Sequence, residues 1–300
     1  MLPFAADTIV LFIAASLTKP MQATLDAYAA RTNTVIQRES GASLEHIRKI
    51  TELHRTPDLL LLADADVFPQ FLVPKYSTWY GEFARNRMVI AYTDKSKHAK
   101  DITASNWTKI LSGNDIEIGR TDPNLAPVGY RTLLMFDLAE KHYKSPGLAK
   151  TLLLHAPEKN IRPNAAELAG LLAAGELDFI YDYQSVAESN GFKFIQLPAQ
   201  IDLGDAKQAA LYQTVSVEVR GSAPGTKATF TGRPILYGAT IPTAAPHARA
   251  AQDLYRYLTS PAIVAQLRAR HIDMLTEPIM VGYGRSSPKS SDQRGPADRR

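Results

Sequence analysis

Three short segments rich in hydroxyl and small residues stand where a predicted strand or loop is followed by a helix. They are Ser16-Leu17-Thr18, Ser40-Gly41-Ala42-Ser43 and Pro127-Val128-Gly129. The first backbone N–H groups of a helix have no partner inside the helix, and the helix dipole makes that end positive. Several such ends that converge on one point would bind an anion. The serines also fit a second interpretation, in which each of them only caps its own helix.

Other residue patterns that could support chemistry are less specific. Asp58, Asp64 and Asp66 could form a carboxylate cluster for acid–base chemistry or for a cation, but Asp64 and Asp66 follow a strand and are typical turn formers. The seven histidines are scattered without i, i+4 pairs, which disfavours a histidine metal site. The sequence contains no phosphate-loop, dinucleotide-binding, nucleophile-elbow or zinc-protease motif. These patterns therefore give little support to a catalytic centre, and taken singly the serines favour the interpretation as helix caps.

Alternating strand and helix patterns supply the elements that must position these segments. A continuous apolar strand at 8–15 is followed by a hydroxyl residue and a proline, and Met21, Leu25 and Tyr28 give the next helix an apolar face. The unit then repeats, which predicts an α/β fold with parallel sheets. We expect further strands at 34–37, 58–63, 87–92, 116–119, 177–181, 192–196, 212–219 and 234–241, and helices after 39–43 and at 106–111, 130–143, 165–174, 245–258 and 261–270.

Length and composition exclude several classes of protein. The 300 residues are 45% hydrophobic and 21% charged, which excludes a largely disordered or fibrous chain and allows two lobes. Residues 285–300 hold five basic and two acidic side chains, so they carry most of the net charge of +4, and the nearly neutral remainder disfavours a nucleic-acid partner.

Cysteine is absent, which excludes disulfides and thiolate metal sites. No apolar run is long enough to span a bilayer, and residues 1–6 fit either a chain start or the remnant of a removed leader. We predict a disordered basic tail at 284–300.

Seven motifs follow one another along the chain: AASLT at 14–18, RESGAS at 38–43, PKYSTWY at 74–80, IAYTDKSK at 90–97, DPN at 122–124, GYR at 129–131 and GELDF at 175–179. Together they resemble the molybdate/tungstate-binding proteins of ABC importers, and they are most similar to the archaeal tungstate-binding branch. The resemblance covers about residues 8–283. It implies a type II periplasmic-binding-protein fold, in which two α/β lobes close over a ligand in the cleft between them. Lobe 1 would comprise residues 1–87 and 235–283, and lobe 2 residues 88–234.

The resemblance also implies a function. The chain would be a monomeric extracytoplasmic solute-binding protein, periplasmic or extracellular and membrane-associated, that delivers molybdate or tungstate to an ABC permease. It would have no catalytic residues, no cofactor and no directly coordinated metal, only an oxyanion ligand. The ligand-binding positions that match are Ser16, Ser43, Val128, Ala165 and Tyr183, with Ser40 as a less certain neighbour.

The sequence departs from the archaeal pattern at two positions. That pattern has an aspartate before the Pro-x-Gly-Tyr-Arg segment and a glutamate at the later helix start, where this chain has Ala126 and Ala165. Without these carboxylates an expanded, octahedral coordination of the metal is not available. The remaining pattern resembles the bacterial molybdate-binding branch, in which hydrogen bonds alone hold a tetrahedral oxyanion.

Three alternatives stay open at this point. The same fold could bind another tetrahedral oxyanion, such as chromate, sulfate or phosphate. An enzyme could use the anion site for a small phosphorylated or carboxylated substrate, with Asp122, Tyr130 or Arg131 as catalytic groups. A cytoplasmic effector-sensing module is the third, although the chain has no second domain for DNA binding.

Overall fold

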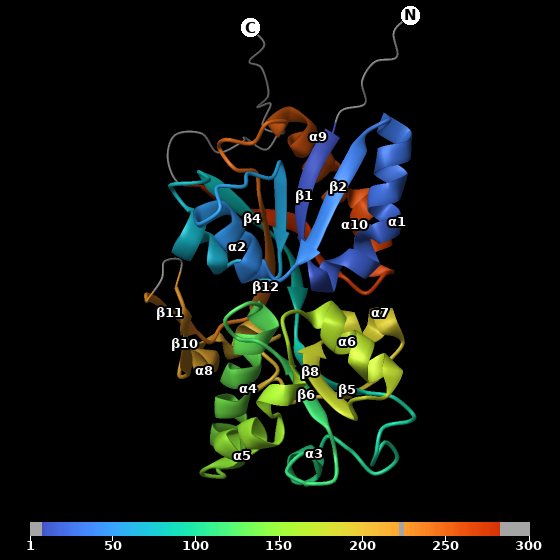
Figure 1. Cartoon of the computed structure of the whole chain (residues 1–300), viewed down its shortest axis with the longest axis vertical. Helices are drawn as coiled ribbons and strands as arrows, with labels where there is room; N and C mark the ends of the chain where they lie inside the picture. The colour runs from blue at the N-terminus through green and yellow to red at the C-terminus, as the bar shows by residue number, and fades with distance from the viewer. Residues whose placement is uncertain (1–7, 222–224, 283–300) are drawn as a thin grey trace, which may run out of the picture.

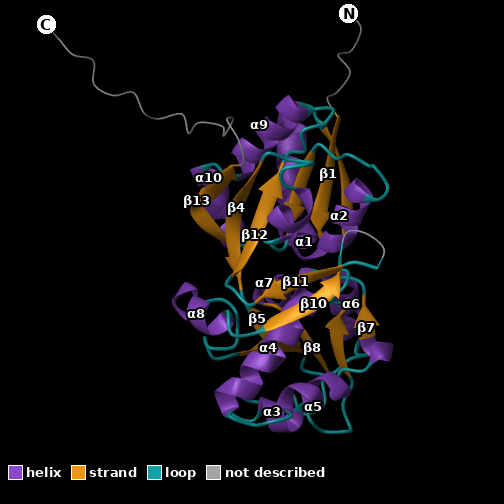
Figure 2. Cartoon of the chain, turned by 90° about the vertical axis from the view of Figure 1, so that its left-hand side faces the viewer, coloured by secondary structure: helices purple, strands orange, loops and turns teal. Residues whose placement is uncertain are grey.

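The computed structural model describes residues 8–221 and 225–282, which form two α/β halves, one above the other in Figure 1. The upper half is built on a six-stranded sheet with the strand order β13-β4-β12-β3-β1-β2. The lower half is built on a five-stranded sheet with the order β7-β6-β8-β5-β9. A two-stranded ribbon, β10-β11, lies at the left side of the lower half in Figure 1 and faces the viewer in Figure 2. The upper half is the first lobe and the lower half is the second lobe.

Each lobe combines a sheet with its own helices. The first lobe contains β1 (Thr8–Ala14), β2 (Val35–Gly41), β3 (Leu59–Leu62), β4 (Trp79–Asn86), β12 (Ile235–Thr240), β13 (Asp273–Gly282), α1 (Ala15–Thr32), α2 (Ser43–Thr51), α9 (Ala248–Leu258), α10 (Pro261–Arg268) and the π-helical turn η1 (Phe68–Leu72). The second lobe contains β5 (Met88–Tyr92), β6 (Ile118–Thr121), β7 (Ile161–Arg162), β8 (Phe179–Tyr183), β9 (Lys193–Gln196), β10 (Ser216–Arg220), β11 (Lys227–Thr231), α3 (Trp107–Ile110), α4 (Pro127–Tyr143), α5 (Leu148–His155), α6 (Ala165–Ala174), α7 (Gln184–Asn190), α8 (Ala209–Tyr212) and two short 3-10 turns, η2 (Glu158–Asn160) and η3 (Ala206–Gln208).

The first strand shows why the sequence forms this core. β1 pairs in parallel with both β2 and β3, and Ile9, Leu11 and Ile13 are fully buried. A strand in the interior of a sheet covered on both faces reads as a continuous apolar run, which is the pattern at 8–15. β1 ends at Ala14 and α1 begins at Ala15, so the carboxyl end of the strand leads directly into the helix.

Two connections join the lobes. β4 ends at Asn86 and β5 begins at Met88, so the chain passes from one sheet to the other across a single residue. The chain returns after β11 and enters β12, which pairs antiparallel with β3 and β4. Figure 2 shows β4 and β12 running side by side toward the junction of the lobes. The lobe boundaries predicted at residues 87/88 and 234/235 stay predictions.

The element predictions fail at several places. Residue 212, predicted to begin a strand, is the last residue of α8, and β10 begins only at Ser216. The helix predicted from residue 130 begins at Pro127, because a proline at the first helical position already has the required φ. The strands β4, β7, β11 and β13 and the helices α5, α7 and α8 were not predicted. The predicted tail at 284–300 and residues 1–6 lie outside the described residues.

Candidate ligand-binding site

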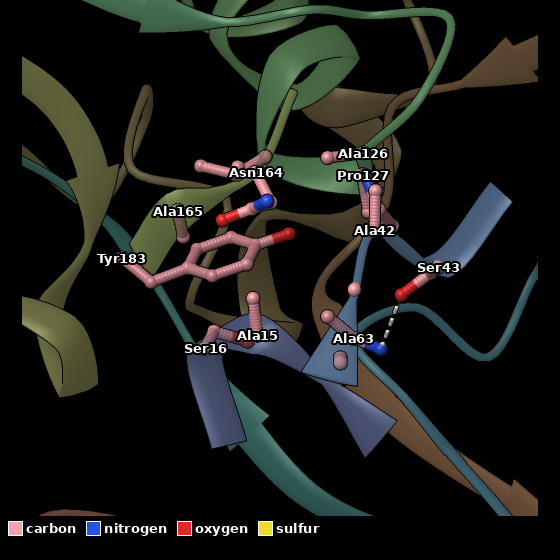
Figure 3. A pocket seen from close by; sticks show the side chains of 13 residues that line it. Ala15, Ser16, Ala42, Ser43, Ala63, Ala126, Pro127, Asn164, Ala165 and Tyr183 are labelled. Carbon is pink, nitrogen blue, oxygen red and sulfur yellow. Dashed lines mark hydrogen bonds between the residues drawn. The ribbon is translucent and has the colours of Figure 1, made fainter. Parts of the chain in front are cut away.

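A small cavity lies between the two lobes (Figure 3). Five helices begin at its wall. The residues that cap the amino ends of α1, α2, α4, α6 and α7 all line it. The cavity volume is about 10 Å³, close to the minimum that holds one small molecule such as water. The lining comprises Ala14, Ala15, Ser16, Gly41, Ala42, Ser43, Ala63, Ala126, Pro127, Val128, Asn164, Ala165 and Tyr183.

Three of the five cap positions are alanines. Ala14, Ala42 and Ala126 provide no side-chain hydrogen bond to α1, α2 and α4. Only Asn164 caps its helix by a side chain, accepting a hydrogen bond from the backbone N–H of Glu167 at 3.0 Å. Buried helix ends without caps need another partner for their N–H groups. Four of these helices are eight residues or longer, so their positive ends add to a field that favours a negative guest.

The two serines in the lining are not caps. Ser16 is the second residue of α1, and its Oγ accepts a hydrogen bond from the Tyr237 hydroxyl at 3.1 Å. Ser43 is the first residue of α2, and its Oγ accepts from the backbone N–H of Ala63 at 3.1 Å. Each serine oxygen therefore already receives a proton from the protein, and its own proton is left for another acceptor. This arrangement contradicts the interpretation of both serines as simple helix caps.

Tyr183 brings a third hydroxyl to the cavity. The side chain is 1% exposed, and its Oη has no hydrogen-bond partner among the described residues. Figure 3 shows its ring reaching into the cavity from the end of β8. Burial raises the pKa of this hydroxyl well above its usual range, so the group remains a neutral donor. A buried polar group without a partner is costly, which makes Tyr183 a group that a ligand would satisfy.

The structure brings five of the six predicted positions to one cavity. Ser16, Ser43, Val128, Ala165 and Tyr183 all line it. Ser40 does not, because its exposed side chain has its Oγ 2.8 Å from Thr18 Oγ1.

The side chain of Asn164 lines the cavity but was not predicted to do so. Asparagine directly before a predicted helix is a common N-cap, and that signal could have identified it.

The two alanines that replace carboxylates in the archaeal pattern also line the cavity. Ala126 caps α4 and Ala165 is the first residue of α6. None of the thirteen lining residues is acidic or basic. Among the described residues, no group of three or more His, Cys, Asp or Glu side chains could hold a metal ion. The cavity wall therefore offers neutral donors rather than metal-coordinating groups.

Contacts between the lobes surround this cavity. The backbone N–H of Leu44, on α2, donates to the carbonyl oxygen of Leu125 at 3.0 Å. On another side, Lys19 Nζ on α1 donates to Asn190 Oδ1 on α7 at 2.8 Å. The lobes are therefore in contact around the cavity in this structure.

A buried ionic network joins the lobes behind the cavity wall. Arg131 donates to Asp64 through Nε at 2.9 Å, and the Tyr130 hydroxyl donates to the same carboxylate at 2.6 Å. Arg131 also lies 3.3 Å from Asp66, which pairs with Arg233. Burial and the neighbouring Asp64 raise the pKa of Asp66 to about 6.

This network corrects two expectations. Asp64 does form a turn by accepting from the N–H of Asp66 at 2.9 Å, but it is also the partner of Arg131. Asp58 does not form a cluster with Asp64. Its carboxylate instead accepts hydrogen bonds from the N–H of Val10 at 2.8 Å and from the N–H of His247. Tyr130 and Arg131, proposed above as catalytic groups of an enzyme, are buried in structural contacts.

The family of the chain is decided by sequence comparison. Residues 9–271 match the family described as bacterial extracellular solute-binding protein. The chain belongs to this family. A solute-binding protein of Petrotoga mobilis is 40% identical over 254 residues, which cover 84% of this chain and 79% of that one. The molybdate/tungstate-binding protein of Pyrococcus abyssi is 33% identical over 302 residues, covering 91% and 86%.

Solved structures support the fold of this solute-binding protein. The periplasmic molybdate-binding protein of Azotobacter vinelandii has a TM-score of 0.58 at 16% identity, covering 88% of this chain and 98% of that one. The sulfate-binding protein of Mycobacterium tuberculosis has a TM-score of 0.61 at 12% identity, covering 89% and 86%. The predicted type II periplasmic-binding-protein fold is confirmed. Members of the family to which the chain belongs bind a ligand rather than a cofactor. No helix in the described part of the chain is long and apolar enough to cross a membrane.

Proposed function

We propose that this solute-binding protein captures one molybdate or tungstate ion as a tetrahedral oxyanion in the interlobe cavity and delivers it to an ABC permease. The observation that carries the proposal is the set of five helix ends and the unpartnered Tyr183 hydroxyl at one small cavity. The names of relatives such as the Pyrococcus protein support this choice of ligand. The protein would act outside the cytoplasm, as a monomer and without turnover.

The proposed ligand donors are all neutral. Ser16, Ser43 and Tyr183 would donate from hydroxyls, and Val128 and Ala165 from the backbone N–H groups at the starts of α4 and α6. A dianion that enters a dry cavity loses its hydration, so its oxygens need fixed donors in return. A hydrogen bond to a charged group contributes about 1.5–3 kcal/mol, and five of them would support tight binding.

The absence of lining carboxylates determines the proposed coordination. Alanine at 126 and 165 leaves no carboxylate oxygen to join the metal centre. The oxyanion would therefore stay tetrahedral and be held by hydrogen bonds alone. Since molybdate and tungstate have nearly the same size, the cavity should hardly distinguish them, and the smaller sulfate should fit more loosely.

A second candidate is another tetrahedral oxyanion, such as sulfate, chromate or phosphate. The same lack of lining carboxylates favours it, because neutral donors suit any dianion of this shape. Phosphate is disfavoured because at neutral pH it carries a proton, for which the lining offers few acceptors.

Calorimetry on ligand-free protein tests the proposal directly. We expect one site that binds molybdate and tungstate with similar affinity, and much weaker binding of sulfate, chromate and phosphate. A thermal-shift series provides an independent measurement, because a ligand at about 100 times its Kd stabilises the folded state by roughly 2.7 kcal/mol. Preferred binding of sulfate, chromate or phosphate would support the second candidate. No binding of any oxyanion would reject both.

A further inference from the structure

A chain of hydrogen bonds runs from the connection between the lobes to the hydroxyl of Ser16. We propose that Tyr237, which lies behind the cavity wall, is a positioning residue that fixes Ser16 as a proton donor to the bound anion. Tyr237 thereby disfavours oxyanions that carry a proton. This inference rests on the function proposed above. Tyr237 lies on β12 and does not line the cavity itself.

The donor-to-acceptor direction of this series of hydrogen bonds is set at Asn86, the last residue of β4. Its Oδ1 accepts hydrogen bonds from the backbone N–H groups of Arg87 at 2.9 Å and Ser185 at 3.4 Å. Backbone N–H groups can only donate, so the oxygen of the amide must face them. The amide nitrogen therefore faces the other way, and it donates to Ser185 Oγ at 2.7 Å and to Tyr237 Oη at 2.8 Å.

Tyr237 passes this direction on to Ser16. Because its hydroxyl oxygen accepts from Asn86, its own proton is directed to Ser16 Oγ, 3.1 Å away. Burial raises the pKa of Tyr237, so the hydroxyl keeps its proton at neutral pH. The ring is held by contacts with Phe83 and Tyr183, at centroid distances of 6.3 and 5.8 Å. Tyr237 is thus a fixed donor.

The consequence for Ser16 is a fixed orientation of its own proton. A proton from Tyr237 already occupies one side of Ser16 Oγ, so the serine proton points away from Tyr237 and is free for a ligand in the cavity. Ser43 has the same arrangement, because the N–H of Ala63 donates to its Oγ. An oxyanion with an O–H group would direct its proton toward these donor protons. Fully deprotonated oxyanions avoid that conflict.

A double-mutant cycle tests whether Tyr237 acts through Ser16. The four proteins are wild type, Tyr237→Phe, Ser16→Ala and the double variant, and calorimetry measures the Kd for molybdate. We expect Tyr237→Phe to weaken binding about five- to tenfold in the wild-type background, the size of one ordinary hydrogen bond, and to have almost no effect in the Ser16→Ala background. An equal effect in both backgrounds, or none in wild type, would overturn the inference.

Selectivity provides the second measurement. The measured quantity is the ratio of the Kd for hydrogen phosphate to the Kd for molybdate, obtained by displacement. This ratio should be smaller in Tyr237→Phe than in wild type, because the Ser16 hydroxyl is then free to turn and accept a proton from phosphate. An unchanged ratio would count against the inference. Tyr212→Phe is the matched control: this buried tyrosine hydrogen-bonds Asp202 at 3.2 Å, away from the cavity, and its loss should leave affinity and selectivity within about twofold. If the wild-type protein does not bind molybdate at all, the proposed function fails before this inference is reached.

Discussion

Arg131 on α4 of the second lobe donates through Nε to the Asp64 carboxylate at 2.9 Å, although Asp64 follows β3 in the first lobe. Both side chains are almost completely buried. Burial alone would lower the pKa of Arg131, but the Asp64 carboxylate beside it raises the pKa instead, so the guanidinium stays charged. The same guanidinium donates to the carbonyl oxygen of Arg233, just before β12. The ionic network therefore ties the second lobe to the returning connection.

Replacing Arg131 by methionine should destabilise the protein strongly. The substitution removes the charge but keeps much of the side-chain volume, and it leaves Asp64 and Asp66 buried without their shared partner. Breaking a buried pair in this way costs about 3–5 kcal/mol. Urea denaturation would measure the loss. The control is Lys227→Met, which breaks the exposed Lys227–Glu218 pair and should change stability by less than about 1 kcal/mol. Equal effects of the two substitutions would show that the buried network does not stabilise the fold.

Tyr183→Phe should weaken anion binding without destabilising the protein. The Tyr183 hydroxyl has no partner among the described residues, so removing it breaks no hydrogen bond of the ligand-free fold. A lost bond to a charged ligand would weaken binding by tenfold or more. Calorimetry gives the affinity and thermal melting the stability.

Tyr181→Phe is the control for this experiment. Tyr181 lies on the same strand, is fully buried and also has an unpartnered hydroxyl, but it does not line the cavity. This variant should keep both affinity and stability. If the two variants bind molybdate equally well, Tyr183 does not contact the ligand.

The sequence predicted the parts of the site that depend on local pattern. Strand β1 and the start of α1 follow from an apolar run and a helix signal within about twenty residues. The sequence could not decide whether Ser16 is a helix cap. That depends on where α1 begins to within one or two residues. It also depends on the hydrogen bond from Tyr237, which lies 221 residues away. Asp64 and Arg131 are also distant in the chain, so their pairing required the fold.

The missed strands have a related explanation. β4 has the buried pattern of an interior strand but contains Gly81 and Glu82, which interrupt an apolar run. Glu82 is accommodated because Arg233 lies 3.5 Å from it, a contact that is not local in sequence. β13 contains Pro278, which normally argues against a strand, and it lies at the edge of its sheet, where proline is tolerated.

Replacing both Ser16 and Ser43 by alanine should reduce molybdate affinity by at least a hundredfold. Each hydroxyl offers one proton to the cavity, and a hydrogen bond to a charged ligand contributes about 1.5–3 kcal/mol. Stability should fall by about 1–3 kcal/mol per serine, because each substitution leaves a buried donor, the Tyr237 hydroxyl or the N–H of Ala63, without its acceptor. Ser40→Ala is the control, since Ser40 is exposed and outside the cavity, and it should bind like wild type. Retained affinity in the double variant would place the site elsewhere.

Asp182→Asn should make the stability less dependent on pH. Asp182 is fully buried beside Tyr183, and burial raises its pKa to about 8 from the usual 3.8. Between about pH 4 and 8 the unfolded chain therefore releases a proton that the folded chain retains. Wild-type stability should fall as pH rises through this window, by up to about 1.4 kcal/mol per pH unit.

The asparagine variant keeps the acceptor for the N–H of Tyr183, which lies 2.7 Å from Asp182 Oδ1, but it has no proton to lose. Its unfolding free energy should therefore exceed that of wild type above pH 8. Urea unfolding from pH 5 to 9 measures the slope. Asp253→Asn, at an exposed position, should leave the slope as in wild type. A wild-type slope in Asp182→Asn would mean that Asp182 is ionised in the folded protein.

Ala126→Asp tests the tetrahedral coordination. Ala126 is the N-cap of α4 and lines the cavity, so an aspartate there should cap the helix and stabilise the ligand-free protein by about 1 kcal/mol. Its negative charge would face the dianion inside a dry cavity, so we expect molybdate affinity to fall at least tenfold. Ala126→Asn has nearly the same size and caps equally well but carries no charge, and it should lose much less affinity. Tighter binding in Ala126→Asp than in Ala126→Asn would instead mean that the carboxylate joins the metal centre, and that hydrogen bonds alone do not define how this cavity holds its ligand.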